Sequence, residues 1–371
     1  MTRSWAIKAG TGLRLLGWAL ALSLLAGCSA LLEREYSSVT PHSTAPATEG
    51  DPSTLRAESY QELVNALVYL VSTGAEVGTV RLYVDSDRVE SDLEAACLEV
   101  VQEDPLGAYA VEFIKYSLSR VVTYSQADVS ITYRRTREQV DSIVQATGIT
   151  AIRGELESAL TAFAPECVLR ISYFDGDEEF IRALAQQAYR DAPADIPVMP
   201  ELEVFIYPDS GRQRIVEILL RYPLEPAQLE RRKGELALAL DALRWELEGR
   251  AGDTPALEAA QRLLEEGTFD PQGGSTAWDW LHTGQANSEG LSLAMAALCQ
   301  RLELPCLSAQ GELEGEYHCW NLIQTGEGWR HLDLSRLEDP LALYSDSALS
   351  ELGYLWDAGA LPACPPAPGE D

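Results

Sequence analysis

Basic residues are scarce in this sequence of 371 residues, which has 28 Lys and Arg against 58 Asp and Glu and a formal charge of −30. Such a surface repels phosphates, so we expect no nucleic-acid partner. The sequence also lacks CxxC pairs and an evident calcium-type acidic loop, so we expect no metal and no cofactor. In contrast, 46% of the residues are apolar, which excludes disorder throughout and allows two or three domains, each with its own core.

The first 27 residues have the layout of a signal peptide. Three basic residues precede an apolar run, Leu15 to Ala26, that is short for crossing a bilayer. The run ends in Leu-Ala-Gly-Cys, which resembles the bacterial lipobox, where the cysteine is diacylated and becomes the new N-terminus. The resemblance implies a lipid on Cys28 and a protein held by it at the extracytoplasmic face of the cell membrane of a Gram-positive-type bacterium. The alternative is a chance cysteine after a secretory signal.

Residues 28–59 are predicted to be a flexible tether. The segment is rich in Ser, Thr, Pro and Ala and has no helical or strand period after Leu32. Such a segment would lift the folded part away from the lipid surface. The acidic chain itself is repelled by anionic headgroups, so the lipid would provide the attachment.

The other six cysteines do not form the pattern of a disulfide framework. Cys97, Cys167 and Cys299 fall in apolar stretches, where a free cysteine behaves as a small buried hydrophobic residue. Cys299 and Cys306 are the one close pair, and a disulfide between them is an open alternative.

Residues 60–225 show the same order of elements twice. The first copy, residues 60–150, has helical spacing near 63–70 and 93–100 and strand patterns at 80–84, 110–118 and 128–135. The second copy, residues 151–225, has helices at 155–163 and 178–189 and strands at 168–174, 201–208 and 214–223. We therefore expect a duplicated α/β unit, with helices packed on a small antiparallel sheet in each copy.

Residues 226–364 follow a different pattern, and residues 365–371 form a tail. Two helices are expected at 226–248 and 255–266, then a helix from about Ser288 to Leu302 and strands at 316–324 and 328–335. Three motifs lie on these elements. They are Asn-Ser-Glu-Gly at 287–290, His-Cys-Trp-Asn at 318–321 and Trp-Arg-His-Leu-Asp at 329–333.

The order of these motifs resembles the transglutaminase-like superfamily, which has a papain-type cysteine-enzyme fold. The resemblance covers residues from about 255 to 364. It implies an α+β protein, with the duplicated α/β region followed by a transglutaminase-like C-terminal domain. It assigns His318 as the general base and Asp333 as the carboxylate that orients it. Ser288 falls where the family has its nucleophilic cysteine, and this is a departure from the family pattern.

The replacement of sulfur by oxygen has a chemical consequence. A thiol at a helix N-terminus, close to an imidazolium, loses its proton readily because both groups stabilise the anion. A serine hydroxyl holds its proton far more tightly and needs a base in line with the attack and a fitted oxyanion hole. We therefore expect Ser288 to be a feeble or inert nucleophile.

Each site residue also has a simpler interpretation. Ser288 could be the N-cap of the helix, a catalytic serine, or a group that binds an unknown ligand. Cys319 is not expected to replace the missing thiol, because neighbouring residues on a strand point to opposite faces and His318 occupies the other one. His282, in the loop before the helix, is expected to be a surface residue.

The histidine and carboxylate positions also have structural alternatives. His318 and Asp333 could persist because their hydrogen bond joins two strands. His331 shares a strand face with Asp333 and could be the true partner of that carboxylate. Trp320 and Trp329 are expected in the core.

Three functions fit the sequence. The first is a lipid-anchored protein with a transglutaminase-like domain that is not catalytic and binds peptide or cell-wall fragments. The second is an acyl-transfer or peptide-hydrolysing enzyme that uses Ser288, His318 and Asp333. The third is a structural envelope protein that acts through its repeats. The serine at position 288 favours the first.

Overall fold

The computed structural model describes residues 45–49, 51–84, 87–248, 255–338 and 340–366. The predicted signal peptide, Cys28 and the first part of the predicted tether lie outside the described residues, as does most of the predicted tail. Within the described ranges, no helix combines the length and the apolar composition needed to cross a bilayer.

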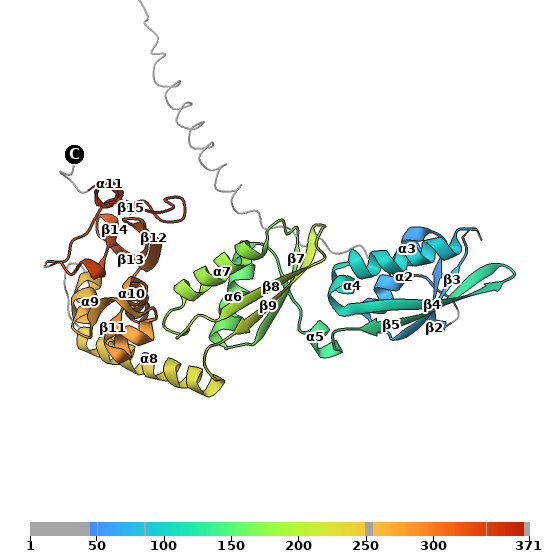
Figure 1. The fold of residues 1–371 in the computed structure, drawn as a ribbon, viewed down its shortest axis with the longest axis horizontal. Helices are drawn as coiled ribbons and strands as arrows, with labels where there is room; N and C mark the ends of the chain where they lie inside the picture. Colours follow the sequence, from blue (N-terminus) through green and yellow to red (C-terminus); the bar gives the residue numbers. More distant parts are fainter. Residues whose placement is uncertain (1–44, 50, 85–86, 249–254, 339, 367–371) are drawn as a thin grey trace, which may run out of the picture. The chain divides into compact units, whose positions relative to one another are not determined.

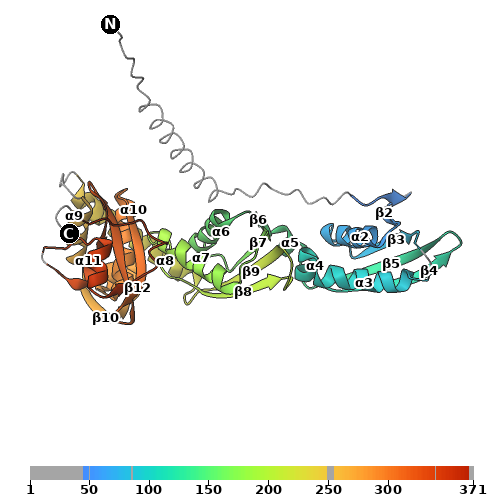
Figure 2. The ribbon, with the colours of Figure 1, turned by 90° about the horizontal axis from the view of Figure 1, so that it is seen from above.

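The first α/β unit is a five-stranded sheet with helices on one face (Figure 1). Its strands are β1 (Thr48–Glu49), β2 (Asp51–Ala57), β3 (Val77–Leu82), β4 (Val111–Val121) and β5 (Tyr124–Tyr133), in the order β1-β2-β3-β5-β4. Its helices are α2 (Tyr60–Ser72), α3 (Val89–Gln102) and α4 (Pro105–Ala110). Alternate residues of β5, from Ser125 to Ile131, are buried, because only one face of the sheet is covered. β4 and β5 form a long hairpin (Figure 2).

The second α/β unit has a four-stranded sheet. Its strands are β6 (Val144–Ala146), β7 (Glu166–Ser172), β8 (Glu201–Tyr207) and β9 (Gln213–Arg221), in the order β6-β7-β9-β8. Its helices are α6 (Ile149–Thr161) and α7 (Glu178–Asp191), and the short α5 (Arg137–Asp141) precedes β6. This order, and the direction of each strand, match those of β2-β3-β5-β4 in the first sheet.

Three sequence-based expectations about this region are wrong. Residues 51–57, placed in the tether, form β2, in which Leu55 and Ala57 are fully buried. The boundary at residue 150 is too late, because β6 already pairs with β7. The sheets are mixed rather than antiparallel, since β2 is parallel to β3 and β6 to β7. β6 has only three residues, and both β2 and β6 depend on a partner strand beyond the following helix, which a local pattern does not reveal.

A buried ion pair joins the two units. Arg135, which follows β5, lies 2.6 Å from the carboxylate of Glu217 on β9, and the Tyr207 hydroxyl donates to the same oxygen at 3.2 Å. The Arg135 guanidinium also covers the ring of Tyr109, which in turn contacts the Tyr207 ring edge-on. Polar and aromatic groups therefore connect α4 to the second sheet.

The last third is built around one buried helix. Its early elements are α8 (Pro226–Leu247), α9 (Pro255–Leu264), β10 (Thr268–Gly274), a π-helical turn η1 (Asp279–Thr283) and β11 (Gln285–Ala286). They are followed by α10 (Ser288–Arg301), β12 (Cys306–Leu313), β13 (Glu316–Thr325), β14 (Gly328–Leu332), η2 (Leu334–Arg336), α11 (Asp346–Glu351) and β15 (Tyr354–Leu355). The predicted helices and strands of this region are present within a few residues.

α10 lies against an antiparallel sheet with the order β14-β13-β12-β15 (Figure 2). Every residue from Gly290 to Cys299 is buried, so this part of the helix is enclosed on all sides rather than on one face. Its apolar residues belong to one continuous core that also includes residues of the second α/β unit. This burial fixes the N-terminus of α10, where Ser288 lies.

The described cysteines are all free. Cys97 and Cys299 are buried as predicted, whereas Cys167 is half-buried. Cys306 hydrogen bonds to Cys299, and this bond, with burial, raises the pKa of the Cys306 thiol well above its usual value. The alternative of a Cys299–Cys306 disulfide is therefore wrong for this structure.

Candidate functional site

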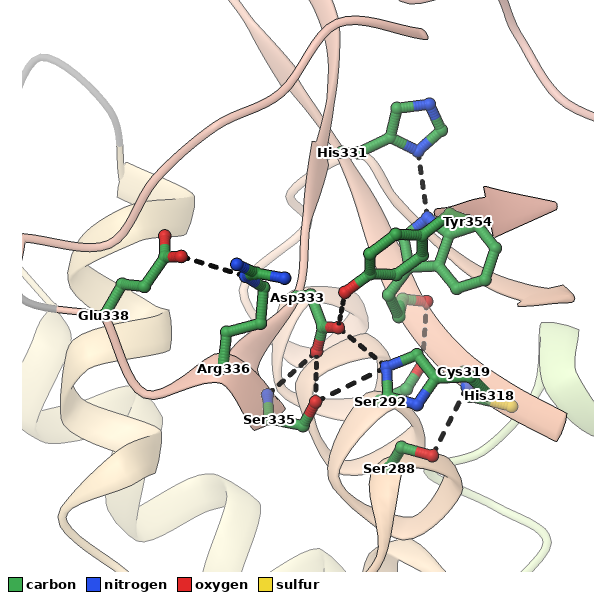
Figure 3. Close-up of polar contacts among 11 residues, drawn as sticks. Ser288, Ser292, His318, Cys319, His331, Asp333, Ser335, Arg336, Glu338 and Tyr354 are labelled. Atoms are coloured by element: carbon green, nitrogen blue, oxygen red, sulfur yellow. Dashed lines mark hydrogen bonds and ion pairs between the residues drawn. The ribbon is translucent and has the colours of Figure 1, made fainter. Parts of the chain in front are cut away.

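The predicted histidine and aspartate form a pair. His318 lies on β13 and Asp333 directly follows β14, and His318 Nε2 is 2.7 Å from Asp333 Oδ2 (Figure 3). The His318 side chain is 12% exposed and the Asp333 side chain 1% exposed. The contact therefore lies at the inner end of a site whose histidine still reaches solvent.

Two residues that the sequence analysis did not identify, Ser335 and Tyr354, hydrogen bond to Asp333. The Ser335 backbone N–H and hydroxyl donate to Asp333 Oδ1 at 2.9 and 2.7 Å, and the Tyr354 hydroxyl donates to Oδ2. Burial alone would raise the pKa of Asp333, but the hydrogen bond and charge of His318, with the bonds from Tyr354 and Ser335, lower it. An ionised Asp333 accepts only, so His318 Nε2 carries the proton.

Ser288 is the first residue of α10 but not its cap. The cap is Asn287, whose side chain accepts from the Gly290 N–H at 3.1 Å. The expectation that Ser288 caps the helix is therefore wrong by one residue. The Ser288 hydroxyl instead accepts a hydrogen bond from the Cys319 N–H of β13 at 3.3 Å. This bond ties the start of the helix to the strand that carries His318.

Ser288 lies beside the His318 ring without a hydrogen bond to it. Figure 3 shows Ser288 on the side of the ring away from Asp333. His318 Nε2 is used by Asp333, which leaves Nδ1 as the nitrogen that could serve a nucleophile. Within the described part of the chain, no hydrogen bond joins the Ser288 hydroxyl to this ring. The three predicted residues are thus close together, but only two of them interact.

Cys319 is not a substitute nucleophile. Its side chain is 2% exposed, and its thiol donates to the Tyr317 hydroxyl at 3.3 Å. Burial raises the pKa of the Cys319 thiol to about 12, so the thiol is protonated at neutral pH.

His331 has a different partner from the one considered for it. Its Nε2 donates to Asp346 Oδ1 at 2.9 Å, and the indole N–H of Trp320 donates to its Nδ1 at 2.9 Å. The interpretation of His331 as the partner of Asp333 is therefore wrong. Burial, only partly offset by Asp346, lowers the pKa of His331, which agrees with a neutral ring that accepts at Nδ1.

His331, Asp346 and Cys364 bring three metal-ligand atom types within 4.8 Å of one another. A metal ion at His331 Nε2 would require the proton to move to Nδ1. That nitrogen already accepts from Trp320, whose indole can only donate. The three residues are therefore better described as a hydrogen-bonded cluster that fixes β14 against the start of α11.

The remaining predicted positions are structural. Trp320 is 1% exposed and lies in the core, and Trp329 is half-buried. His282 is exposed, as expected, and stacks on the ring of Trp278.

Gly290 lets the first turn of α10 pack closely against the backbone of Gly274 and Thr276. A methyl group at this position would lie 2.7 Å from the Gly274 carbonyl oxygen and 3.0 Å from that of Thr276. Gly290→Ala should therefore lower the free energy of unfolding by about 1–3 kcal/mol, because backbone atoms must shift to admit the methyl group. Gly234→Ala in α8, where nothing lies within 4 Å, is the control and should stabilise by up to about 1 kcal/mol. Urea denaturation measures both, and a stabilising Gly290→Ala would contradict the packing.

Comparisons with known proteins add little to this geometry. No family model matches the chain, and no curated protein matches it. A solved structure of a protein named as a TGase has 11% identity and a TM-score of 0.27, and the match covers 64% of this chain and 68% of that one.

Two other solved structures are similar to part of the chain. A candidate cysteine protease from Cytophaga hutchinsonii has 14% identity and a TM-score of 0.25, over 39% of this chain and 65% of its own. A candidate protease from Parabacteroides distasonis has 10% identity and a TM-score of 0.16, over 72% of this chain and 44% of its own. Similarities this weak identify neither the fold nor the activity of the chain.

Proposed function

We propose that residues 226–364 form a transglutaminase-like domain that binds peptide or cell-wall fragments without catalysis. The order of elements supports the proposal. A helix begins at the position of the nucleophile, an antiparallel strand carries His318, and Asp333 follows the next strand. The pair of base and orienting carboxylate is intact.

The hydroxyl of Ser288 carries the non-catalytic part of the proposal. The nitrogen of a general base must lie within about 2.6–3.2 Å of the oxygen whose proton it removes. The Ser288 oxygen instead accepts from the Cys319 N–H, and no bond to His318 draws its proton away. A serine in this arrangement stays protonated, so the site keeps its histidine and aspartate and loses its nucleophile.

The proposal places this domain on a lipoprotein. Cys28 would carry the lipid and hold the chain at the extracytoplasmic face, where cell-wall peptides are available. We also infer that the two α/β units are copies of one unit, on the support of their matching strand order and direction. They would place the binding domain at a distance from the lipid surface.

Two measurements on the unmodified protein test the proposal. We expect no covalent labelling of Ser288 by a fluorophosphonate, and reversible binding of the cell-wall fragments (sugars with attached peptides) that a muramidase releases, measured by calorimetry. Ser288→Ala should retain this binding. Labelling at Ser288, or hydrolysis of a peptide that Ser288→Ala abolishes, would instead establish the enzyme. An absence of binding by the folded, unmodified protein would favour a structural role.

A further inference from the structure

Two arginines lie side by side on the open face of the first sheet. Arg56 on β2 and Arg81 on β3 are direct partners in the parallel register of these strands. Their neighbours Leu55, Ala57 and Leu82 are buried, so the two guanidiniums point to the face that the helices do not cover (Figure 1). The Arg56 side chain is 40% exposed and that of Arg81 is 29% exposed. Like charges opposite each other in a sheet repel, so the pair is unfavourable unless an anion is shared between them.

Two tyrosine rings hold the guanidiniums in position. The Arg56 guanidinium lies 4.5 Å from the centre of the Tyr83 ring, and the Arg81 guanidinium lies 5.1 Å from the centre of the Tyr124 ring. The two rings also contact each other, with their centres 5.4 Å apart. A guanidinium that stacks on a ring is restricted in orientation, and its N–H groups stay free to donate in its own plane. The cluster is therefore partly preorganised for a ligand that accepts hydrogen bonds.

The hydrogen-bonding capacity of both arginines is largely unused within the described residues. The Nε atoms of Arg56 and Arg81 are buried and have no hydrogen-bond partner there. The Arg81 guanidinium lies 3.7 Å from Glu49, too far for a hydrogen bond, and the Tyr83 hydroxyl donates to that carboxylate at 2.9 Å. Arg56 lies 2.6 Å from Glu58, but both side chains are at least 40% exposed, and such pairs contribute little stability. Partly buried guanidiniums with so few acceptors indicate that a ligand supplies the rest.

The second α/β unit shows that the fold does not require two arginines at this place. Its strands β6 and β7 place Gln145 opposite Arg170, one residue before their last register partners. Arg56 and Arg81 have the same place in the pairing of β2 and β3. A neutral side chain therefore serves at the position of Arg56 in a sheet of the same strand order, and the second cation needs a reason other than folding.

We propose that Arg56 and Arg81 bind a terminal phosphate group, that of a phosphomonoester. One guanidinium fork already satisfies the two oxygens of a carboxylate, whereas a terminal phosphate has three acceptor oxygens and bridges two forks. Such a phosphate also carries nearly two negative charges at neutral pH, which matches two cations. The chain as a whole is acidic, but physiological salt screens exposed charges beyond about 8 Å, so the local pair determines what binds here.

Equilibrium dialysis of the full chain against radiolabelled inorganic phosphate tests the site. We expect saturable binding, which Arg56→Gln and Arg81→Gln should each weaken about fivefold, the effect of one unit charge near 4 Å in water. Glu49→Gln should instead strengthen binding. This variant removes a carboxylate that competes for Arg81, and its amide oxygen still accepts from the Tyr83 hydroxyl.

Lys115→Gln is the matched control. Lys115 lies on β4, on the same face of the sheet, and its ammonium covers the ring of Phe113, so the variant removes the same charge from a similar setting. An absence of phosphate binding would overturn the site. Equal weakening by Lys115→Gln and Arg81→Gln would also overturn it. Thermal melting of each variant verifies that it is folded.

Vesicles distinguish a lipid from a soluble source of the phosphate. The variant Cys28→Ser, which has no thiol for the predicted lipid, is sedimented with phosphatidylcholine vesicles that contain phosphatidic acid, a lipid with a terminal phosphate. Binding that Arg81→Gln reduces and inorganic phosphate competes away supports the site with a lipid ligand. Binding of inorganic phosphate without vesicle binding supports it with a soluble ligand. The binding role proposed for residues 226–364 is tested separately, since the two arginines belong to the first α/β unit.

Discussion

Ser288→Cys is expected to carry a thiol that iodoacetamide alkylates about tenfold faster at pH 6 than an ordinary exposed cysteine. A thiol at a helix N-terminus beside a histidine has a pKa of roughly 3.5–7.5, against about 8.5 for a free cysteine. At pH 6, a pKa near 6 would raise the thiolate fraction about a hundredfold. Part of this gain is lost, because nucleophilicity falls with the pKa of the thiol, and about a factor of ten remains.

The measurement is the rate of alkylation at position 288 as a function of pH, followed by mass spectrometry of the peptide. Four native thiols give little background, because burial raises the pKa of Cys97 to about 11 and those of Cys167, Cys319 and Cys364 to about 12. Adding His318→Gln should move the midpoint of the rate profile toward 8.5. A midpoint at or above 8.5 in Ser288→Cys itself would contradict a site in which the helix N-terminus and His318 are preorganised to stabilise a thiolate.

The pair at the centre of the site was predictable because the family resemblance assigned both residues, and the local pattern placed them on or beside two strands. His318 and Asp333 lie on or beside strands with clear patterns, and each motif also identifies the residue type. The supporting residues were not predictable in the same way. Tyr354 reaches Asp333 from β15, which pairs with the far side of β12, and no local pattern connects residues 333 and 354. Only Ser335, two residues after Asp333, offered a local signal, the turn that an aspartate forms with a following N–H.

Two predictions, the N-cap of α10 and the partner of His331, were wrong because residue type alone did not decide between the alternatives. Asn287 and Ser288 are both favoured caps, and the close approach of Gly290 to the backbone of β10 is what fixes the start of the helix. His331 does lie two residues before Asp333, but the backbone of Tyr344 pairs with that of His331 and brings Asp346 to its ring. In both cases a contact made by a distant segment decides between equal local alternatives.

Arg135→Met is expected to lower the free energy of unfolding by about 3 kcal/mol, at the lower end of the range for breaking a buried ion pair. Glu217 has a side chain that is 3% exposed, and the variant leaves its carboxylate without the cation at 2.6 Å. The loss is limited because Tyr207 still donates to the same oxygen. Urea unfolding followed by circular dichroism measures the change. Arg137→Met is the control, since the Arg137–Asp141 pair is more than two-thirds exposed on both sides and should change stability little.

The double variant Arg135→Met, Glu217→Gln separates the two origins of this loss. If the loss of stability in Arg135→Met arises from the unpaired charge of the Glu217 carboxylate, replacing that carboxylate by a neutral amide removes the charge. The double variant should then be more stable than Arg135→Met alone. If the cost arises instead from lost packing of the Arg135 guanidinium on the Tyr109 ring, the second substitution should recover nothing. We expect recovery, because Glu217 is almost fully buried whereas Arg135 remains 24% exposed, so the desolvated charge belongs chiefly to the acid. An equal or larger loss in the double variant would show that the aromatic contact, rather than the ion pair, holds the two α/β units together.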